Sequence, residues 1–235
     1  MISLNNNNGR GSISTRIHQG SRYLHEVGPE KVLPLVISLS EFYTNVYMNE
    51  SIPSKENLSL RVCVGEENDA EAIVDVLYKT WLATYPNEDA GITVDDVEDR
   101  FIERRSEAGI EKTRKRLREQ SDDQKTFVVK DGEKVIGVSV VSKDETRNRL
   151  IAIYVLPEYQ GKGVGKMLWN ELQEFFDDDK DIFVELVEYN TSAIAFYTGL
   201  GFQDTGRRFS DESKRMKSGA VLQEMEMRIP RNKYH

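Results

Sequence analysis

A glycine-rich segment with two lysines, VLPEYQGKGVGK over residues 155–166, is the part of the sequence best suited to chemistry. Closely spaced glycines let a backbone approach a ligand and adopt positive φ angles. A helical apolar pattern follows at once, and the free N–H groups and the dipole at a helix start attract an anion. Lys162 and Lys166 add positive charge to the same segment. The segment therefore predicts a binding site for a phosphate or diphosphate.

Two familiar phosphate loops do not fit this spacing. A Walker A loop, G-x-x-x-x-G-K-[ST], would need a glycine in place of Gln160 and a hydroxyl residue in place of Met167. A Rossmann loop, G-x-G-x-x-G, would need its third glycine in place of Lys166 or Leu168. On the glycines alone, a turn that binds no ligand remains the alternative.

The scarcity of histidine and cysteine limits the chemistry that can accompany such a site. Histidines stand only at positions 18, 25 and 235, and Cys63 is the single cysteine. This excludes Ser-His, Cys-His and histidine-ligated metal chemistry from residues 26–234, and a disulfide within the chain. We therefore expect no metal, and we expect acid–base steps to fall to Glu, Asp, Tyr, Lys or water.

Two blocks of sequence resemble the GCN5-related N-acetyltransferase (GNAT) superfamily. The segment QGKGVG, residues 160–165, resembles the Q/R-x-x-G-x-G/A pyrophosphate loop of that family. The strand expected at 151–155, followed by Pro157, is similar to the family's fourth strand and its exit. The block VELVEYNTSAIAFYTGLGF, residues 184–202, resembles the family segment L-x-V-x-x-x-N-x-x-A-x-x-F/L-Y-x-x-x-G-F. The resemblance covers about residues 60–230.

The resemblance implies an α/β fold, a mixed sheet that is splayed between its fourth and fifth strands and has helices on both faces. It also implies acetyl-CoA as co-substrate, with the pantetheine arm lying in the splay. Backbone groups of Ile153, Tyr154 and Val155 would pair with that arm like an added strand, and Asn190 and Tyr197 would flank the thioester. The diphosphate would bind the amides of Gln160, Gly161, Lys162, Gly163, Val164, Gly165 and Lys166.

Catalytic roles follow from the same resemblance. Tyr197 is the candidate general acid, because a phenol with an ordinary pKa of ~10 is protonated at pH 7 and can donate to a departing thiolate. The alternative is a tyrosine that only packs against the sheet. Glu185 is the candidate general base, since the pair resembles the Glu and Tyr of ribosomal-protein alanine N-acetyltransferases, and Glu188 or an ordered water chain are the alternatives. The N–H of Val155 is the expected oxyanion donor. Cys63 lies far from the loop in sequence, so we expect direct attack in a ternary complex.

The acceptor is less well defined by the sequence. We expect a primary amine on a small molecule. Trp81 and Tyr85 are candidate acceptor-binding residues, because the T-W-x-x-T-Y pattern is similar to that of GNAT enzymes thought to act on small amines. Trp81 can equally be a core residue. A protein or peptide N-terminal acetyltransferase and a non-catalytic acyl-CoA-binding module are the alternative functions.

Hydrophobic periodicity predicts the elements that position these residues. Strands are expected at 60–64, 126–130, 134–142, 150–155, 182–187, 203–210 and 222–229, and helices at 68–85, 93–101, 111–120, 163–176 and 192–200. Asn68 with Glu71 is the expected cap of the first helix, and Thr93 with Asp96 that of the second, as in a capping box. An Asp-Gly pair at 131–132 indicates a hairpin.

Composition divides the chain into two parts. Residues 1–59 are expected to be a largely disordered extension and linker, with Met48 as an alternative start, and residues 60–235 the acetyltransferase domain. The net charge is −8, and residues 1–59 hold five basic and five acidic residues, so the excess lies in 60–235. An acidic domain argues against a nucleic-acid partner and mildly favours a cationic acceptor. No apolar run approaches the ~20 residues of a membrane span and no signal peptide is evident, so we expect no membrane partner and a cytoplasmic location. A homodimer stays an open alternative.

Overall fold

The computed structural model describes residues 59–231. The expected N-terminal extension and its alternative start at Met48 therefore lie outside the described residues, apart from Ser59. The strands are β1 (Leu60–Val64), β2 (Gln124–Asp131), β3 (Lys134–Lys143), β4 (Asn148–Val155), β5 (Ile182–Val187), β6 (Gln203–Ser210) and β7 (Gln223–Ile229). The helices are α3 (Ala70–Thr84), α4 (Val94–Ile102), α5 (Glu107–Arg118), α6 (Val164–Leu172) and α7 (Thr191–Gly199), with short 3-10 turns η2 (Glu67–Asp69), η3 (Pro157–Tyr159) and η4 (Glu212–Lys214).

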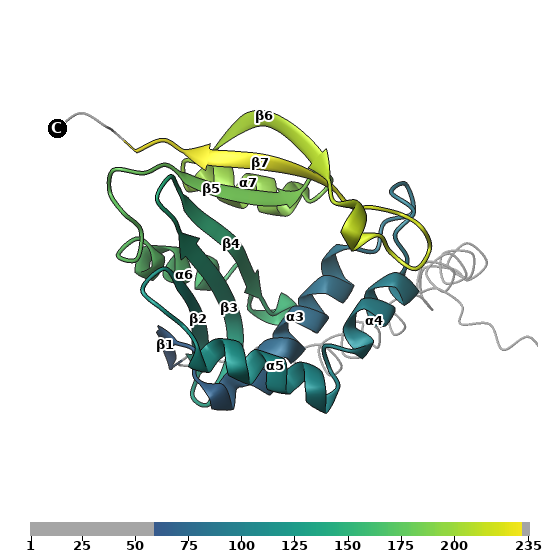
Figure 1. The fold of residues 1–235 in the computed structure, drawn as a ribbon, viewed down its shortest axis with the longest axis horizontal. Helices are drawn as coiled ribbons and strands as arrows, with labels where there is room; N and C mark the ends of the chain where they lie inside the picture. The colour runs from purple at the N-terminus through teal and green to yellow at the C-terminus, as the bar shows by residue number, and fades with distance from the viewer. Residues whose placement is uncertain (1–58, 232–235) are drawn as a thin grey trace, which may run out of the picture. The chain divides into compact units, whose positions relative to one another are not determined.

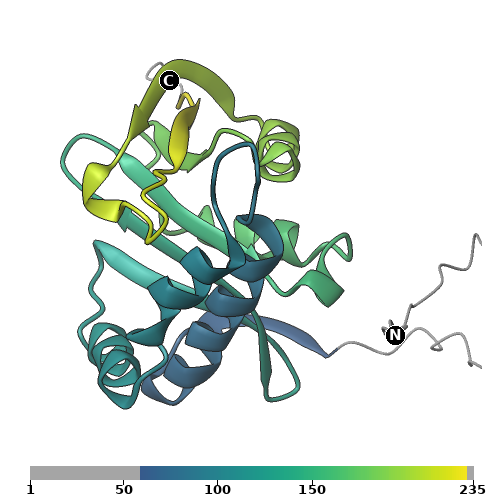
Figure 2. The same ribbon diagram turned by 90° about the vertical axis from the view of Figure 1, so that its right-hand side faces the viewer.

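The strands form one mixed sheet in the order β1-β2-β3-β4-β5-β7-β6. Neighbouring strands are antiparallel except β4 and β5, which are parallel. Figures 1 and 2 show α6 and α7 against one face of the sheet and α3, α4 and α5 on the other side. The expected mixed α/β sheet with helices on both faces is confirmed.

The sheet opens between β4 and β5. Only three residue pairs join these strands, from Asn148–Ile182 to Leu150–Val184, and beyond Leu150 the strands separate (Figure 1). On its other side β4 stays paired with β3 as far as Val155. Ile151 is the extra residue of a β-bulge in β4, because its neighbours Leu150 and Ala152 pair with two consecutive residues of β3 and leave Ile151 without a partner there. The second half of β4 therefore has one paired edge and one edge that faces the opening.

The core lies on both faces of the central strands. In β3 almost every residue from Val135 to Val141 is buried, because helices cover both of its faces. One large apolar cluster joins α3, α5, the sheet and α6, and includes Ile136, Leu150 and Leu168, which are almost fully buried. Burying a side chain of this kind contributes about 1.5–3 kcal/mol.

A second apolar cluster ties the first two helices to the far end of the sheet. Tyr85, Val97 and Phe101 pack there with Val187, which ends β5. Met216 and Leu222, from the segment between β6 and β7, and Ile92 complete it. This cluster fixes the C-terminal end of α3 beside the opening between β4 and β5.

The element boundaries agree with the sequence patterns to within a few residues, with two corrections. The capping box of Thr93 and Asp96 is confirmed. Asn68 is not the cap of the first helix, because a 3-10 turn precedes α3 and its capping box is formed by Glu66 and Asp69. The helix expected over 163–176 ends at Leu172, although its apolar stripe continues to the buried Phe176. Among residues 59–231, no helix is both long and apolar enough to cross a membrane.

Candidate active site

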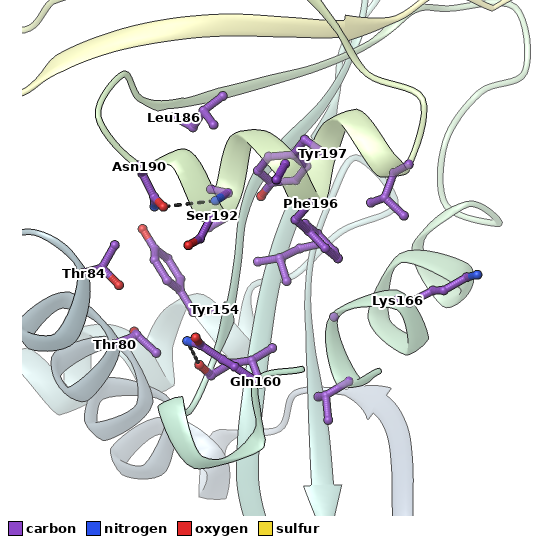
Figure 3. A pocket seen from close by; sticks show the side chains of 18 of the residues that line it. Thr80, Thr84, Tyr154, Gln160, Lys166, Leu186, Asn190, Ser192, Phe196 and Tyr197 are labelled. Atoms are coloured by element: carbon purple, nitrogen blue, oxygen red, sulfur yellow. Dashed lines mark hydrogen bonds between the residues drawn. The ribbon is translucent and has the colours of Figure 1, made fainter. Parts of the chain in front are cut away.

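A cavity of about 600 Å³ occupies the opening between β4 and β5. Its walls are the end of α3, the second half of β4, the glycine-rich loop with the start of α6, and the segment from β5 to α7 (Figure 3). Its size is in the usual range for small-molecule sites. It is lined by Ile153, Tyr154, Val155, Gln160, Gly161, Gly163, Val164, Gly165, Lys166, Glu185, Asn190 and Tyr197, among others. Residues from the two separate sequence blocks therefore meet in one cavity.

The glycine-rich loop turns the start of α6 toward this cavity. Gly161 and Gly163 have positive φ angles of 72° and 85°, which side-chain-bearing residues rarely adopt. Gly163 is the N-cap of α6, and the first N–H to bond within the helix is that of Met167, 3.0 Å from the Gly163 carbonyl. The three preceding N–H groups have no partner inside the helix. With the helix dipole they suit a diphosphate.

Gly165 has a structural reason in addition to the one that the sequence indicated. A Cβ atom at Gly165 would lie 3.1 Å from Cζ of Phe196 on α7. The glycine therefore allows α6 and α7 to pack closely across the cavity. Lys166 extends from α6 away from Tyr154 and the centre of the cavity (Figure 3).

The exposed edge of β4 presents backbone donors to the cavity. The Leu156 N–H bonds to the Ile136 carbonyl at 2.9 Å, so Leu156 faces β3. Because successive residues of a strand point their N–H groups to opposite sides, those of Ile153 and Val155 point toward the cavity. Gln160 donates from Nε2 to the Val155 carbonyl at 2.9 Å. Its side chain therefore holds the loop against the end of β4, a role that the sequence did not indicate.

Three of four neighbouring tyrosines, Tyr85, Tyr154 and Tyr197, line the cavity, and the fourth, Tyr189, contacts Tyr85. Tyr197 is 5% exposed, and this burial raises its pKa well above the ordinary value. The neighbouring Tyr154 raises the pKa further, whereas a backbone hydrogen bond from Ile153 lowers it. The hydroxyl of Tyr154 lies 3.4 Å from that of Tyr85, whose pKa is also raised by burial. Tyr189 donates to the Tyr85 carbonyl at 2.6 Å, and burial raises its pKa to about 12. The Tyr197 phenol is therefore fully protonated at neutral pH.

Asn190 serves the fold and the cavity together. Its Oδ1 accepts from the Ala193 N–H at 3.1 Å and so caps α7 (Figure 3). The cap uses only the oxygen, so the NH₂ group can still donate to a ligand. Thr80 and Thr84 line the opposite wall from α3. Their four-residue spacing places them on one helix face, which is the signal that could have identified them.

Glu185 lies at the rim of the cavity rather than inside it. Its side chain is about half exposed and its Oε1 is 3.2 Å from Nη1 of Arg207. Glu188 has a similar exposure and a similar partner, Arg208, at 3.0 Å, but it does not line the cavity.

Two further candidates lie outside the cavity lining. The Lys162 ammonium is 5.2 Å from the ring centre of Tyr159. Trp81 packs between Tyr85 and Phe101, with ring-centre distances of 4.4 and 5.7 Å. Tyr85 does line the cavity. Within residues 59–231, no three His, Cys, Asp or Glu side chains are grouped so that they could hold a metal ion.

Comparison with protein families agrees with this geometry. The model of the acetyltransferase (GNAT) family matches residues 92–202, which include the glycine-rich loop, Asn190 and Tyr197. Residues 92–202 therefore belong to the acetyltransferase (GNAT) family. The chain is 30% identical over 91 residues to N-acetyltransferase 8F1 of Rattus norvegicus. The aligned stretch covers 35% of this chain and 41% of the relative, so the match spans less than half of the relative's length.

Solved structures share the GNAT fold at low sequence identity. The PaiA N-acetyltransferase of Thermoplasma acidophilum, in complex with coenzyme A, is 20% identical with a TM-score of 0.55, over 71% of this chain and 98% of that one. A GNAT-family acetyltransferase of Streptococcus pneumoniae is 19% identical with a TM-score of 0.55, over 73% and 99%. A ribosomal-protein alanine N-acetyltransferase of Escherichia coli is 16% identical with a TM-score of 0.50, over 75% and 96%.

Proposed function

We propose that this GNAT protein transfers the acetyl group of acetyl-CoA to a primary amine by direct attack in a ternary complex. One observation carries the proposal: the cavity between β4 and β5 is lined by the helix start at Gly163, the open edge of β4, and the side chains of Asn190 and Tyr197. These are groups for a diphosphate, a pantetheine arm and a thioester. Coenzyme A in the Thermoplasma relative is consistent with this assignment.

The chemistry can be assigned to groups at the inner end of the cavity. The amine lone pair attacks the thioester carbonyl carbon, a C–N bond forms, and the C–S bond breaks with its electron pair on sulfur. The N–H of Val155 is oriented to stabilise the oxyanion. The Tyr197 hydroxyl gives its proton to the sulfur, and the amine loses a proton to a base or to water.

Glu185 is the base we favour. It lies at the rim of the cavity, whereas Glu188 does not line it. Because its side chain is about half exposed, the Glu185 carboxylate can accept the proton of the amine and pass it on to water. Trp81 is left out of the proposed acceptor site because it does not line the cavity, and Tyr85 is kept.

A small-molecule amine is the acceptor class we favour over a peptide. The segment between β6 and β7 is bound to the start of α4, since the Ser218 N–H donates to Asp96 Oδ1 at 2.7 Å and the Ser218 Oγ donates to the Gly91 carbonyl at 3.2 Å. Met216 of the same segment packs into the second apolar cluster. Because these contacts tie the segment to the start of α4, we expect them to disfavour an extended peptide that would have to lie between the segment and α4.

The cofactor assignment is tested with Gly163→Val, which we expect to remain folded and to lose acetyl-CoA binding in calorimetry. Valine cannot easily hold the left-handed N-cap that aims the α6 N–H groups at the ligand. Gly206→Val is the matched control, since Gly206 has a similar φ of 81° and lies outside the cavity. Unchanged affinity in folded Gly163→Val contradicts the cofactor assignment. Thiol release from acetyl-CoA over a panel of amines tests transfer itself.

A further inference from the structure

A second cavity, of about 440 Å³, adjoins the first at the closed end of the opening. It is lined by Ser142, Arg147, Arg149, Leu150, Ile151, Phe183, Glu185, Arg207 and Glu226. Ile151, the bulged residue of β4, and Glu185 line both cavities. A molecule in the second cavity can therefore extend to Glu185 and Ile151 at the border with the first cavity.

The carboxylates of this second cavity are already paired. Glu185 of β5 and Glu226 of β7 stand directly opposite each other in the sheet, where two like charges repel. Nη1 of Arg207 lies 3.2 Å from Glu185 and 2.9 Å from Glu226 and bridges them. The Thr205 hydroxyl also donates to Glu226 at 3.1 Å. The two acidic groups are thus largely satisfied by the protein.

Arg147 is placed differently. Its guanidinium lies over the ring of Phe183, 4.7 Å from the ring centre. Its nearest carboxylate among the described residues is Glu226, at 3.9 Å, too far for a hydrogen bond. Arg149, in contrast, pairs at 3.3 Å with Asp144, which lies outside the cavity lining. The cavity therefore holds an oriented guanidinium with hydrogen-bond donors to spare.

We propose that the acceptor is an amine that also carries a carboxylate, and that Arg147 binds this carboxylate. The inference rests on the proposed acetyl transfer. A planar guanidinium held over an aromatic ring matches the two oxygens of a carboxylate, and such charge-assisted pairs are strong and directional. With its carboxylate on Arg147, the acceptor can extend its amine toward Glu185 and Ile151. A purely cationic polyamine would instead meet three guanidinium groups.

The test uses the full chain, acetyl-CoA and matched acceptors: straight-chain ω-amino acids of increasing length, each compared with its carboxamide and with the corresponding diamine. At the best chain length we expect kcat/KM for the acid to exceed that of the amide by roughly ten- to hundredfold, the range of one charged hydrogen-bonded contact. In Arg147→Ala the ratio of kcat/KM for the acid to kcat/KM for the amide should fall to near one, while acetyl-CoA affinity is unchanged. Arg147→Lys should keep part of the preference for the acid. Arg228→Ala is the control, because Arg228 is a similarly exposed, ion-paired arginine outside both cavities.

Amides or diamines that outperform the acids at every length overturn the inference, and so does an acid preference that survives in Arg147→Ala. If no amine is acetylated, binding of the same acids is measured by ligand-detected NMR in the presence of coenzyme A. Binding that Arg147→Ala abolishes would then support the carboxylate site while contradicting acetyl transfer. Absence of binding by all the acids would overturn the inference itself.

Discussion

At the scale of single residues, several residues that line the candidate site also have a structural role. Asn190 caps α7, Gln160 ties the loop to β4, and Gly165 makes room for Phe196. Sequence patterns identified these positions through their resemblance to a family. They could not reveal these structural roles, because each depends on a contact that forms only after the elements have packed.

Tyr197→Phe tests the general acid. The change removes the only proton that this buried side chain can donate and keeps its ring, which packs 5.4 Å from that of Phe202. We expect unchanged acetyl-CoA affinity and a kcat lower by roughly 10–1,000-fold. Pre-steady-state kinetics must show that chemistry limits the rate. An unchanged rate of the chemical step removes Tyr197 from the mechanism.

Glu185→Gln and Glu188→Gln form a matched pair for the base. The two carboxylates have similar exposure and each pairs with an arginine, but only Glu185 lines the cavities. We expect Glu185→Gln to lower kcat/KM roughly tenfold or more near neutral pH. Glu188→Gln should behave as the wild type. The reverse result assigns the base to Glu188, and wild-type activity in both variants favours water.

At the scale of elements, α4 shows how far local sequence patterns reach. The capping box of Thr93 and Asp96 could be predicted because it lies within four residues. The second carboxylate oxygen of Asp96 accepts from Ser218, 122 residues away, and no local pattern indicates that bond. The same limit explains why Asn68 was wrongly predicted as the cap of the first helix, since the turn before α3 is capped by Glu66 and Asp69 instead. Local signals thus predicted most elements, while the contacts that close the site depend on distant segments.

Asp96 is expected to hold the segment between β6 and β7 against α4. Burial alone would raise its pKa, but hydrogen bonds from Thr93 and Ser218 outweigh burial and lower the pKa to about 2. A carboxyl with a lowered folded-state pKa stabilises the protein above its unfolded pKa of ~4. That contribution is lost as the pH falls from about 4 toward 2. Asp96→Ala removes the hydrogen bonds to this carboxylate, so it should cost about 1.5–3 kcal/mol in urea unfolding at pH 7 and remove this part of the acid dependence.

Asp95→Ala is the control for that experiment, because Asp95 is an exposed neighbour in the same first turn. Equal losses of stability in the two variants would mean that Asp96 acts only through the helix dipole. A higher KM for the acceptor in Asp96→Ala, with unchanged acetyl-CoA affinity, would link the segment between β6 and β7 to acceptor binding.

At the scale of the whole molecule, the charge that lines a cavity differs in sign from the net charge of the chain. The net charge of −8 favoured a cationic acceptor, yet the second cavity is lined by three arginines and two glutamates. Composition averages over the surface and cannot locate a charge in a cavity. The mixed fold and its splay could be anticipated through the resemblance, whereas this second cavity could not. It depends on the pairing of β5 with β7 and on side chains of β6.

The buried tyrosines make the folded state sensitive to alkali. Burial raises the pKa values of Tyr85, Tyr189 and Tyr197 above the ordinary ~10, so the unfolded chain ionises these groups first. Their contribution to stability is complete below pH ~10 and falls as the pH rises further. We expect an ultraviolet titration to show a group of tyrosines that ionise only with unfolding. Ionisation of every tyrosine near pH 10 in the folded protein would contradict this.

The short junction between β4 and β5 has a consequence for how long the protein survives. Only three residue pairs span the junction, so the two halves of the sheet share few main-chain hydrogen bonds. A ligand along the open edge of β4 adds contacts to both halves and binds only the folded chain. At a concentration 100 times its Kd it would add about 2.7 kcal/mol to the free energy of unfolding. Under the proposed function that ligand is acetyl-CoA, so the resistance of the protein to proteolysis would rise with the acetyl-CoA concentration.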